Sequence, residues 1–270
     1  MYKRQAWETC KVSTKKLKVT KDFDAVVLGV SIGALPSVAG ELIEREPKWR
    51  AMVRHVKAVP TQAFQVWMNR DVHQLGWPRA GVNLSGYVEP FDTWADMSHL
   101  IQEEEWDEPV RSIAYFCSVL SDAVPPSGEV TKEFYQQQRL KVRDNAIGYL
   151  KNDARALWPK AIKPNGKFRW KLLNTGSAHR DLSGAERFDS QFWTANVNPS
   201  DLYVQSVPGS CIYRVSPLDM SFDNLTIAGD WTKSGLDSGC IESAVMSGLL
   251  AAHALSGSPS LQNIVGYDHP

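Results

Sequence analysis

The C-terminal segment 222–255 constrains the fold of this chain more than any other part. The stretch FDNLTIAGDWT (222–232) predicts a short strand that emerges into a glycine–acid turn at Gly229 and Asp230. A loop follows, and a helix is then predicted over 240–255 because apolar residues recur there at helical spacing. These residues are Ile241, Ala244, Val245, Gly248, Leu249, Ala252 and Leu255. Several of them are small, so we expect this face of the helix to pack closely against a sheet.

The order strand, glycine loop, helix has a chemical consequence. It places unpaired backbone N–H groups and the positive end of a helix dipole at the mouth of a sheet, where an anionic group is stabilised. Gly229 permits close approach of the backbone to a ligand, and Asp230 can accept hydrogen bonds from sugar-like hydroxyls. On physical grounds alone, such an element can hold a phosphate, a carboxylate or a flavin ring, or can be only a capped helix.

A second strand is predicted near the N-terminus. Residues 23–30 form a continuous apolar, β-branched run that is followed by Gly33, Ala34, Leu35 and Pro36. Such a run is typical of a strand that is buried on both faces, inside a sheet. Other periodicities predict further elements, namely helices over 47–57 and 131–158, the latter with an interruption at Gly148, and strands over 63–68, 82–88 and 111–118. The chain is therefore expected to be a mixed α/β protein.

Two stretches of the C-terminal segment carry a family resemblance. The string NLTIAGDWT (224–232), followed by GCIESAVMSG (239–248), closely resembles the C-terminal FAD motif of the flavin amine oxidase, protoporphyrinogen oxidase and phytoene desaturase superfamily. Residues 23–36 resemble that superfamily's returning strand, and residues 207–214 resemble the hairpin ahead of the motif. The resemblance thus brackets the chain.

The resemblance implies FAD as the cofactor. The cofactor-binding residues that it implies are Gly229, Asp230, Trp231, Gly239, Cys240 and Ile241. Gly229 and Asp230 would meet the ribityl and pyrophosphate region, whereas the backbone of 239–241 would face the pyrimidine edge of the flavin ring. Their N–H groups and the helix dipole would stabilise negative charge on the ring as it is reduced.

The resemblance also implies an arrangement in two domains. Residues 1–35 and 195–270 would form the flavin-ring half of a discontinuous FAD-binding domain, and residues 36–194 a substrate-binding domain with a mixed sheet and helices. The implied reaction is hydride transfer from an amine or another apolar small molecule to N5 of the flavin. The six histidines are scattered, and neither a catalytic residue nor a metal site can be named from the sequence.

One part of the family pattern is absent. Members of the superfamily begin with a βαβ unit that carries G-x-G-x-x-G, but the first 22 residues here contain no glycine. We therefore expect a subunit or C-terminal portion of an oxidoreductase, with a second chain supplying the dinucleotide-binding unit in a hetero-oligomer. The alternative is a non-catalytic interaction subunit that keeps the fold and binds no flavin.

A serine hydrolase is a less favoured alternative. The residues Gly29-Val30-Ser31-Ile32-Gly33 match the G-x-S-x-G nucleophile elbow, with Ser31 as the nucleophile. The preceding residues are too few for the strands and the oxyanion-hole loop that this fold requires, and Pro36 falls where the elbow's helix would run. Ser31 is therefore interpreted as a turn residue.

Composition narrows the partners and the compartment. Thirty basic residues balance thirty acidic ones, which disfavours nucleic acid and anionic membranes as partners. The four cysteines, Cys10, Cys117, Cys211 and Cys240, are far apart, which argues against a disulfide framework and a zinc site. No apolar run is suitable for a signal peptide or a membrane span, so a cytoplasmic location is expected.

Overall fold

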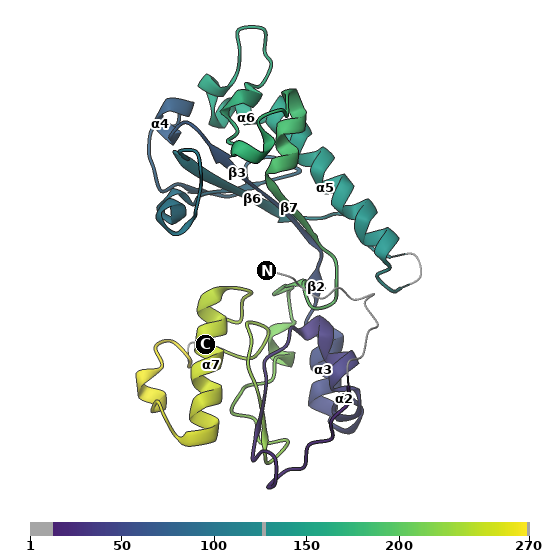
Figure 1. Cartoon of the computed structure of the whole chain (residues 1–270). Helices are drawn as coiled ribbons and strands as arrows, with labels where there is room; N and C mark the ends of the chain where they lie inside the picture. Colours follow the sequence, from purple (N-terminus) through teal and green to yellow (C-terminus); the bar gives the residue numbers. More distant parts are fainter. Residues whose placement is uncertain (1–12, 126–127, 269–270) are drawn as a thin grey trace. The chain divides into compact units, whose positions relative to one another are not determined.

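The computed structural model describes residues 13–125 and 128–268, which fall into two compact units (Figure 1). Unit 1 combines the N-terminal residues up to Val59 with the residues from Asn198 onward, and unit 2 comprises Pro60–Val197. The chain therefore leaves unit 1, builds unit 2 from one continuous segment, and returns to complete unit 1.

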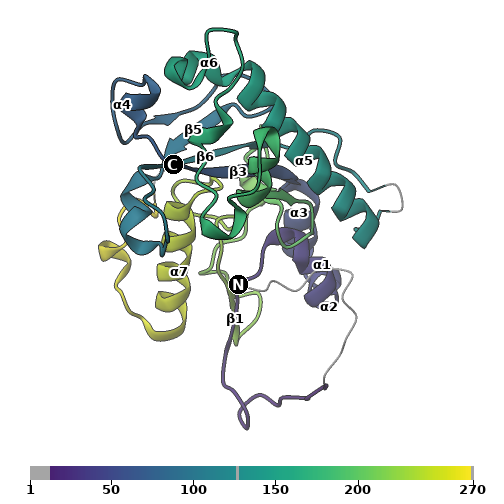
Figure 2. The ribbon, with the colours of Figure 1, turned by 45° about the horizontal axis from the view of Figure 1, so that its top comes forward.

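Unit 1 is built on a short parallel strand pair. Strands β1 (Val26–Leu28) and β9 (Leu225–Ile227) pair in parallel with Val26 opposite Leu225. Figure 2 shows α7 on one side of β1 and the N-terminal helices on the other. The remaining elements of unit 1 are η1 (Ile32–Ala34), α1 (Leu35–Val38), α2 (Gly40–Arg45), α3 (Pro47–His55), β2 (Ala58–Val59), β8 (Tyr203–Val204), η7 (Cys211–Tyr213), α7 (Ile241–Ser256) and η8 (Leu261–Asn263).

Helix α3 shows how the local sequence starts a helix and turns its apolar residues toward the core of unit 1. Pro47 occupies its first position, where the fixed φ of proline suits a helix, and the Glu46 side chain accepts a hydrogen bond from the backbone N–H of Lys48. Trp49 and Met52 then lie one turn apart on the buried face. They join a core that also contains Ile32, Leu35, Ala39, Val56, Val204, Val215, Ile227 and Trp231. This core anchors β9, which leads into the predicted cofactor loop.

Strand β1 lies where the sequence predicts it, but the prediction that it is buried on both faces is wrong. Val27 is 50% exposed and Val26 is exposed as well. Within the described residues β1 pairs only with β9, and the sheet has two strands. Continuous apolar runs are typical of parallel strands that are covered on both faces, and this chain covers β1 only in part.

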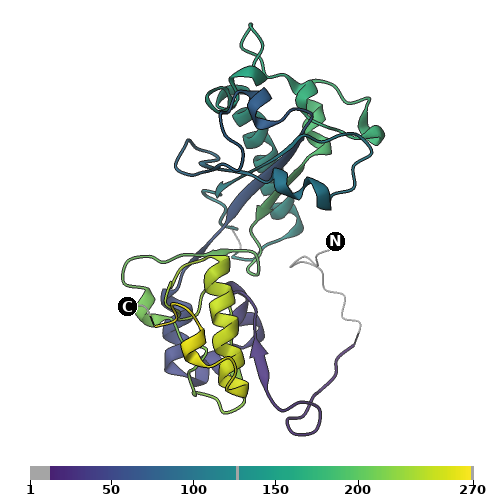
Figure 3. The ribbon, with the colours of Figure 1, turned by 90° about the vertical axis from the view of Figure 1, so that its left-hand side faces the viewer.

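Helix α7 also lies where it is predicted, but the face expected to pack against the sheet is the exposed one. Ile241 is 80% and Val245 is 57% exposed, and Leu249 and Leu255 are exposed on the same face. The buried residues are Ser243, Met246, Ser247, Leu250 and Ala251. Met246 and Leu250 pack with Leu261, Ile264 and Tyr267 of the segment that follows the helix, and Ser247 accepts a hydrogen bond from the loop. Figure 3 shows this segment running back beside α7.

Unit 2 is a five-stranded antiparallel sheet with strand order β4-β5-β6-β3-β7. Its central pair is long, with β3 residue Thr61 opposite Val119 and Met68 opposite Ser112 of β6. Helix α5 runs across the sheet and contacts β7 and β3 (Figure 2). The elements are β3 (Thr61–Met68), α4 (Val72–Leu75), β4 (Asn83–Leu84), β5 (Thr93–Asp96), η2 (Ser98–Glu103), β6 (Ser112–Val119), α5 (Lys132–Asn152), α6 (Ala154–Leu157), η3 (Pro159–Ala161), η4 (Trp170–Leu172), η5 (Ser177–His179), η6 (Gly184–Ser190) and β7 (Phe192–Asn196).

Aromatic side chains fill the core of unit 2. Phe64 and Phe116 are fully buried and stacked, with ring centroids 4.6 Å apart, and Tyr149 of α5 packs edge-on against Phe116 at 5.3 Å. Such aromatic pairs stabilise the fold by more than their buried apolar area alone accounts for. Trp94 and Trp158, two of the tryptophans that are abundant in this part of the sequence, are fully buried in the same core.

In unit 2, the positions of the helices and strands are predicted better than their lengths. The strands predicted over 63–68 and 111–118 are present, whereas the strand predicted over 82–88 is reduced to the two residues of β4. The predicted helix 131–158 is present as two helices that are separated at Asp153, so the interruption predicted at Gly148 is wrong. Gly148 is tolerated inside α5 because its neighbours supply the buried face.

The boundaries of the compact units differ from those predicted for the domains. The predicted boundaries are at 35/36 and 194/195, whereas the compact units divide at 59/60 and 197/198. Helices α1 to α3 belong to unit 1 because Leu35, Trp49 and Met52 pack into the same core as Ile227. The assignment of an FAD-binding and a substrate-binding role to the two parts stays a prediction. Among the described helices, none is both long enough and apolar enough to cross a bilayer.

Candidate cofactor site

The loop that follows β9 depends on Gly229. Its φ is +151°, in the region that favours glycine, and a Cβ atom there would lie 2.4 Å from Nε1 of Trp231. The Trp231 indole is almost fully buried and donates to the carbonyl of Val30 at 2.9 Å. A glycine is therefore required for the chain to turn over this ring.

Two buried hydroxyls tie the loop to α7. The N–H of Gly229 donates to Oγ of Ser247 at 2.9 Å, and Oγ1 of Thr232 donates to the Gly229 carbonyl at 2.9 Å. The two hydroxyls lie 2.7 Å from each other, and both side chains are fully buried. The turn at 229–232 is thus fixed to the middle of the helix.

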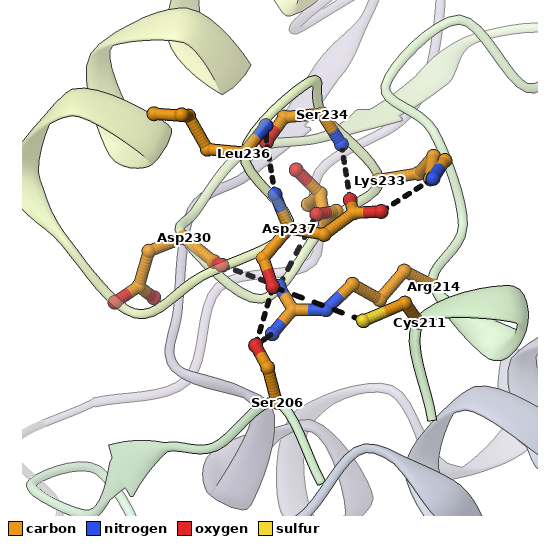
Figure 4. Close-up of polar contacts among 9 residues, drawn as sticks. Ser206, Cys211, Arg214, Asp230, Lys233, Ser234, Leu236 and Asp237 are labelled. Carbon is orange, nitrogen blue, oxygen red and sulfur yellow. Dashed lines mark hydrogen bonds and ion pairs between the residues drawn. The ribbon is translucent and has the colours of Figure 1, made fainter. Parts of the chain in front are cut away.

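A buried arginine holds the loop from the other side (Figure 4). Arg214 is 5% exposed, and its guanidinium donates to the Asp230 carbonyl at 2.6 Å and to Ser206 Oγ at 3.1 Å. No carboxylate of the described residues forms an ion pair with it, and its Nε has no hydrogen-bond partner. Arg214 therefore places a positive charge at the loop. Among the described residues, its hydrogen bonds go only to backbone carbonyl and hydroxyl oxygens.

The next turn is closed by Asp237. Its carboxylate accepts from the Ser234 N–H at 2.8 Å and pairs with Lys233, and the Asp237 N–H donates to Ser234 Oγ at 3.2 Å (Figure 4). Asp237 itself has a positive φ of 47°, which Asp tolerates better than most residues. These bonds leave Asp237 engaged in the loop.

The Asp230 carboxylate, in contrast, is not bonded to any other described residue of the loop. Apart from a hydrogen bond with its own backbone N–H, no hydrogen bond or ion pair to this carboxylate is present within the described residues, and the side chain points away from the Arg214 cluster in Figure 4. Burial raises the pKa of Asp230, an effect that the positive charge of Arg214 opposes. A half-buried carboxylate that is bonded only to its own backbone N–H destabilises the chain on its own and is available to accept further hydrogen bonds from a ligand.

The first turn of α7 begins at Cys240. The Cys240 sulfur accepts from the Ser243 N–H at 3.4 Å, so it acts as a weak N-cap, and the cysteine is free. The N–H groups of Ile241 and Glu242 have no hydrogen-bond partner in the described part of the chain. Together with the dipole of a 16-residue helix, they form a local positive end.

Two of the predicted cofactor-binding residues are also packed within the chain. A Cβ at Gly239 would lie 2.6 Å from the Val204 carbonyl, and the Gly239 carbonyl accepts from the Tyr203 hydroxyl. The Trp231 side chain lies in the core of unit 1. The structure thus brings all six predicted residues into one strand–loop–helix element, and their contacts with a cofactor stay a prediction.

Ser31 has an ordinary structural role. Its hydroxyl donates to the Pro199 carbonyl at 3.2 Å, and the elements that follow are the short η1 and the four-residue α1 instead of an elbow's long helix. A Cβ at Gly33 would lie 2.4 Å from the Pro199 oxygen, so close packing accounts for this glycine. We find no base bonded to Ser31 among the described residues.

Comparison with known families now identifies the element. Residues 173–256 match the family of flavin containing amine oxidoreductases. This flavin amine oxidoreductase match covers β9, the 229–239 loop and α7, and it confirms the resemblance seen in the sequence. No curated protein matches the chain. A solved oxidoreductase from Methanosarcina mazei is similar over 84% of this chain and 42% of its own length, with 10% identity and a TM-score of 0.48. The chain thus spans less than half of that protein.

Sequence reasoning missed Arg214 and Ser247 as parts of this site. Ser247 could have been found, because it lies four residues after Ser243, so that two hydroxyl groups share one face of the predicted helix. Arg214 offered no such signal. It reaches the loop only because η7 folds back against residues 230–232.

Proposed function

We propose that this chain carries the flavin-ring side of an FAD-dependent oxidoreductase of the amine-oxidase type. The observation that carries the proposal is the element from β9 to α7, which lies inside the family match. Among the described residues, no other residue donates a hydrogen bond to the Asp230 carboxylate, and the N–H groups of Ile241 and Glu242 have no partner. Unsatisfied polar groups grouped at a helix N-terminus fit a polar ligand with both donors and acceptors.

The residues present fit the flavin cofactor of this family. Asp230 would accept hydrogen bonds from hydroxyls of the ribityl chain, and the first turn of α7 would favour negative charge on the ring. FAD, when bound, supplies the acceptor for a hydride from the substrate. The chain's own contribution is to orient the ring and to stabilise its charge. Arg214 adds a positive charge behind the Asp230 carbonyl.

The substrate is inferred to be an amine or another apolar small molecule bound by unit 2. The support is the resemblance, in which the residues between the two halves of the flavin-binding part bind the substrate. Hydride transfer to a flavin requires proximity and a suitable electrostatic environment more than a set of acid and base residues. The absence of a recognisable catalytic triad in the sequence is compatible with this reaction.

We further propose that a second chain with a G-x-G-x-x-G dinucleotide-binding unit completes the cofactor site. The apolar outer face of α7 and the open edges of the β1–β9 pair support this. A two-stranded parallel sheet with an exposed valine run is unusual, since parallel sheets are normally covered on both faces. A neighbouring parallel strand with its helix would cover both features.

The direct test is the absorbance spectrum of the chain co-purified with the product of the adjacent reading frame. Flavin bands together with a second chain that carries G-x-G-x-x-G are the expected result. Asp230→Ala should lower the flavin content of that assembly several-fold, and the matched control Asp223→Ala, at an exposed aspartate seven residues earlier, should leave it unchanged. Equal flavin content in both variants would contradict the role of Asp230.

The alternative of a non-catalytic interaction subunit makes a different prediction. An assembly that forms but is colourless would favour it over the oxidoreductase. The packing of Trp231 and Gly239 inside the chain is compatible with that alternative, because it shows a structural reason for two motif residues that is independent of flavin.

A further inference from the structure

A cavity of about 390 Å³ lies in unit 2 beyond the end of β3. Arg111 and Arg187 contribute cations to its lining, and Asn69 and Asn174 contribute amides. The one carboxylate in the lining, Glu108, is already paired with Arg180 at 2.6 Å. None of these residues belongs to the candidate cofactor site.

Within the described ranges, the two arginines of this cavity have no anionic partner. The terminal nitrogens of Arg187 donate to the carbonyls of Leu173 and Leu182, and its Nε is buried without a hydrogen-bond partner. The Arg111 guanidinium forms no hydrogen bond or ion pair with any described residue. Arg187 is half-buried, and a half-buried charge is normally paired. The exposed Arg111 adds a second cation to the same cavity, so an anion bound there would meet both.

A second cavity, of about 410 Å³, is adjacent, because Asn69 lines both and Leu172 and Leu173 line one each. Its cations are Arg70, Lys163, Arg169 and Lys171, and it has no acidic lining residue. The partly buried Trp170 adds an aromatic surface, held edge-on to Phe168 with ring centroids 4.9 Å apart. The pair of cavities is thus basic throughout and apolar at one point.

The sequence around these cavities shares this charge. Residues 151–180 contain eight Lys and Arg residues and a single acidic residue, Asp153, in a chain whose overall charge balances. Exposed lysines alone indicate no more than a solvated surface. Here, however, six cations line two adjoining hollows, where the field of like charges is concentrated.

We infer that these adjoining cavities, which we call the basic cavity pair, bind an organic phosphate or diphosphate. Arginine forks match phosphate oxygens in a bidentate manner. Six cations against one engaged carboxylate favour a ligand with more than one negative charge, which a diphosphate supplies and a single carboxylate does not. Trp170 offers a surface for the organic part. This inference is independent of the flavin site, since all of its residues belong to unit 2.

The test is calorimetric titration of the full chain with inorganic diphosphate at low and constant ionic strength. Arg111→Met and Lys171→Met each remove one cation from a different cavity, and both side chains are exposed and free of hydrogen bonds, so the fold should tolerate the changes. Each should weaken diphosphate binding about tenfold, as expected for loss of a charge-assisted contact. The matched control is Arg79→Met, at an exposed arginine of unit 2 that lines neither cavity.

Two results would overturn the inference. One is the absence of saturable diphosphate binding to the unmodified chain. The other is an equal loss of affinity in Arg79→Met and Arg111→Met, which would mean that diffuse surface charge attracts the anion. Diphosphate bound at the flavin site would be insensitive to Arg111→Met and Lys171→Met but sensitive to Asp230→Ala, so that outcome would also count against the basic cavity pair.

Discussion

The ionised Asp230 carboxyl group should lower the free energy of unfolding of the chain. Burial raises its pKa above the usual value of 3.8, so the folded state binds this proton more tightly than the unfolded state does. The contribution of Asp230 to the free energy of unfolding therefore falls as the pH rises from the pKa of this group in the unfolded chain through its pKa in the folded chain. We expect Asp230→Asn to raise the Tm at pH 7 and to have a smaller effect near pH 4, in thermal unfolding followed by circular dichroism.

The exposed Asp223 provides the control for this measurement. Asp223→Asn should show no comparable gain that grows with pH. A loss of stability in Asp230→Asn at pH 7 would mean that the carboxylate is engaged by a group of the chain, and the assignment of Asp230 as a free ligand acceptor would then be abandoned.

A substitution at Gly229 should destabilise the chain, whereas Asp230→Asn should stabilise it. Gly229→Ala places a methyl group against the Trp231 ring at a φ of +151°, and it should lower the free energy of unfolding by about 2 kcal/mol. Gly40→Ala is the control, because a Cβ at Gly40 meets no atom within 4 Å. Urea unfolding midpoints of the two variants should differ clearly; a mild effect of Gly229→Ala would show that the loop can rearrange around the ring.

The site residues that could be predicted from the sequence are those whose role depends on their neighbours in the chain. Gly229 and Asp230 follow directly from the strand–turn pattern, and the structure gives Gly229 a steric reason. Arg214 was not predictable, because its contacts to the carbonyls of Asp230 and Thr232 join segments 16 and 18 residues apart. Such contacts depend on how η7 packs, which no local periodicity records.

Helix α7 should become more stable when its glycine is removed. Gly248 lies in the middle of the helix on the outer face, and a Cβ there meets no atom within 4 Å. Gly248→Ala should therefore raise the free energy of unfolding of the isolated chain by roughly 1 kcal/mol, the difference in helix propensity. Chemical denaturation of the chain alone measures this.

The same position should respond differently in an assembly. If a partner packs closely on the outer face of α7, then Gly248→Leu should weaken the assembly while leaving the isolated chain folded. Gly148→Leu, at a glycine in α5 with no atom within 4 Å of its Cβ, is the matched variant on a different helix. Equal assembly of both variants would exclude α7 as the close-packed surface.

For helices and strands, position was easier to predict than orientation. Periodicity located α3, α7, β3 and β6, because these elements carry clear apolar repeats. It did not tell which side of α7 this chain covers, since the Ser247 hydroxyl accepts from the Gly229 N–H of the loop and the Ser243 hydroxyl accepts from the Cys240 thiol of the cap. The break of the long helix at Asp153 was also missed: the residues after it, Leu157 and Trp158, are packed in the core of unit 2, and no local periodicity indicates the change of direction.

The whole chain combines two separately packed units with very different surfaces. The overall charge balance concealed the basic cavity pair of unit 2, because a sum over 270 residues averages out a local excess. Likewise, overall hydrophobic content gave no sign that unit 1 presents an apolar helix face and an open parallel strand. Both features appear only after the chain is divided into its compact units.

The apolar face of α7 should make the isolated chain self-associate. Ile241, Val245, Leu249 and Leu255 expose a continuous apolar stripe on one helix, and contiguous apolar surface of this kind promotes association in water. Val245→Lys places a charge at the centre of the stripe on a side chain that is already 57% exposed, so folding should be unaffected. Sedimentation velocity at increasing concentration should show association for the unmodified chain and a shift toward monomer for Val245→Lys. The control is Val124→Lys, at an exposed valine of unit 2; if it disperses the protein equally well, net charge and not the α7 face governs the association.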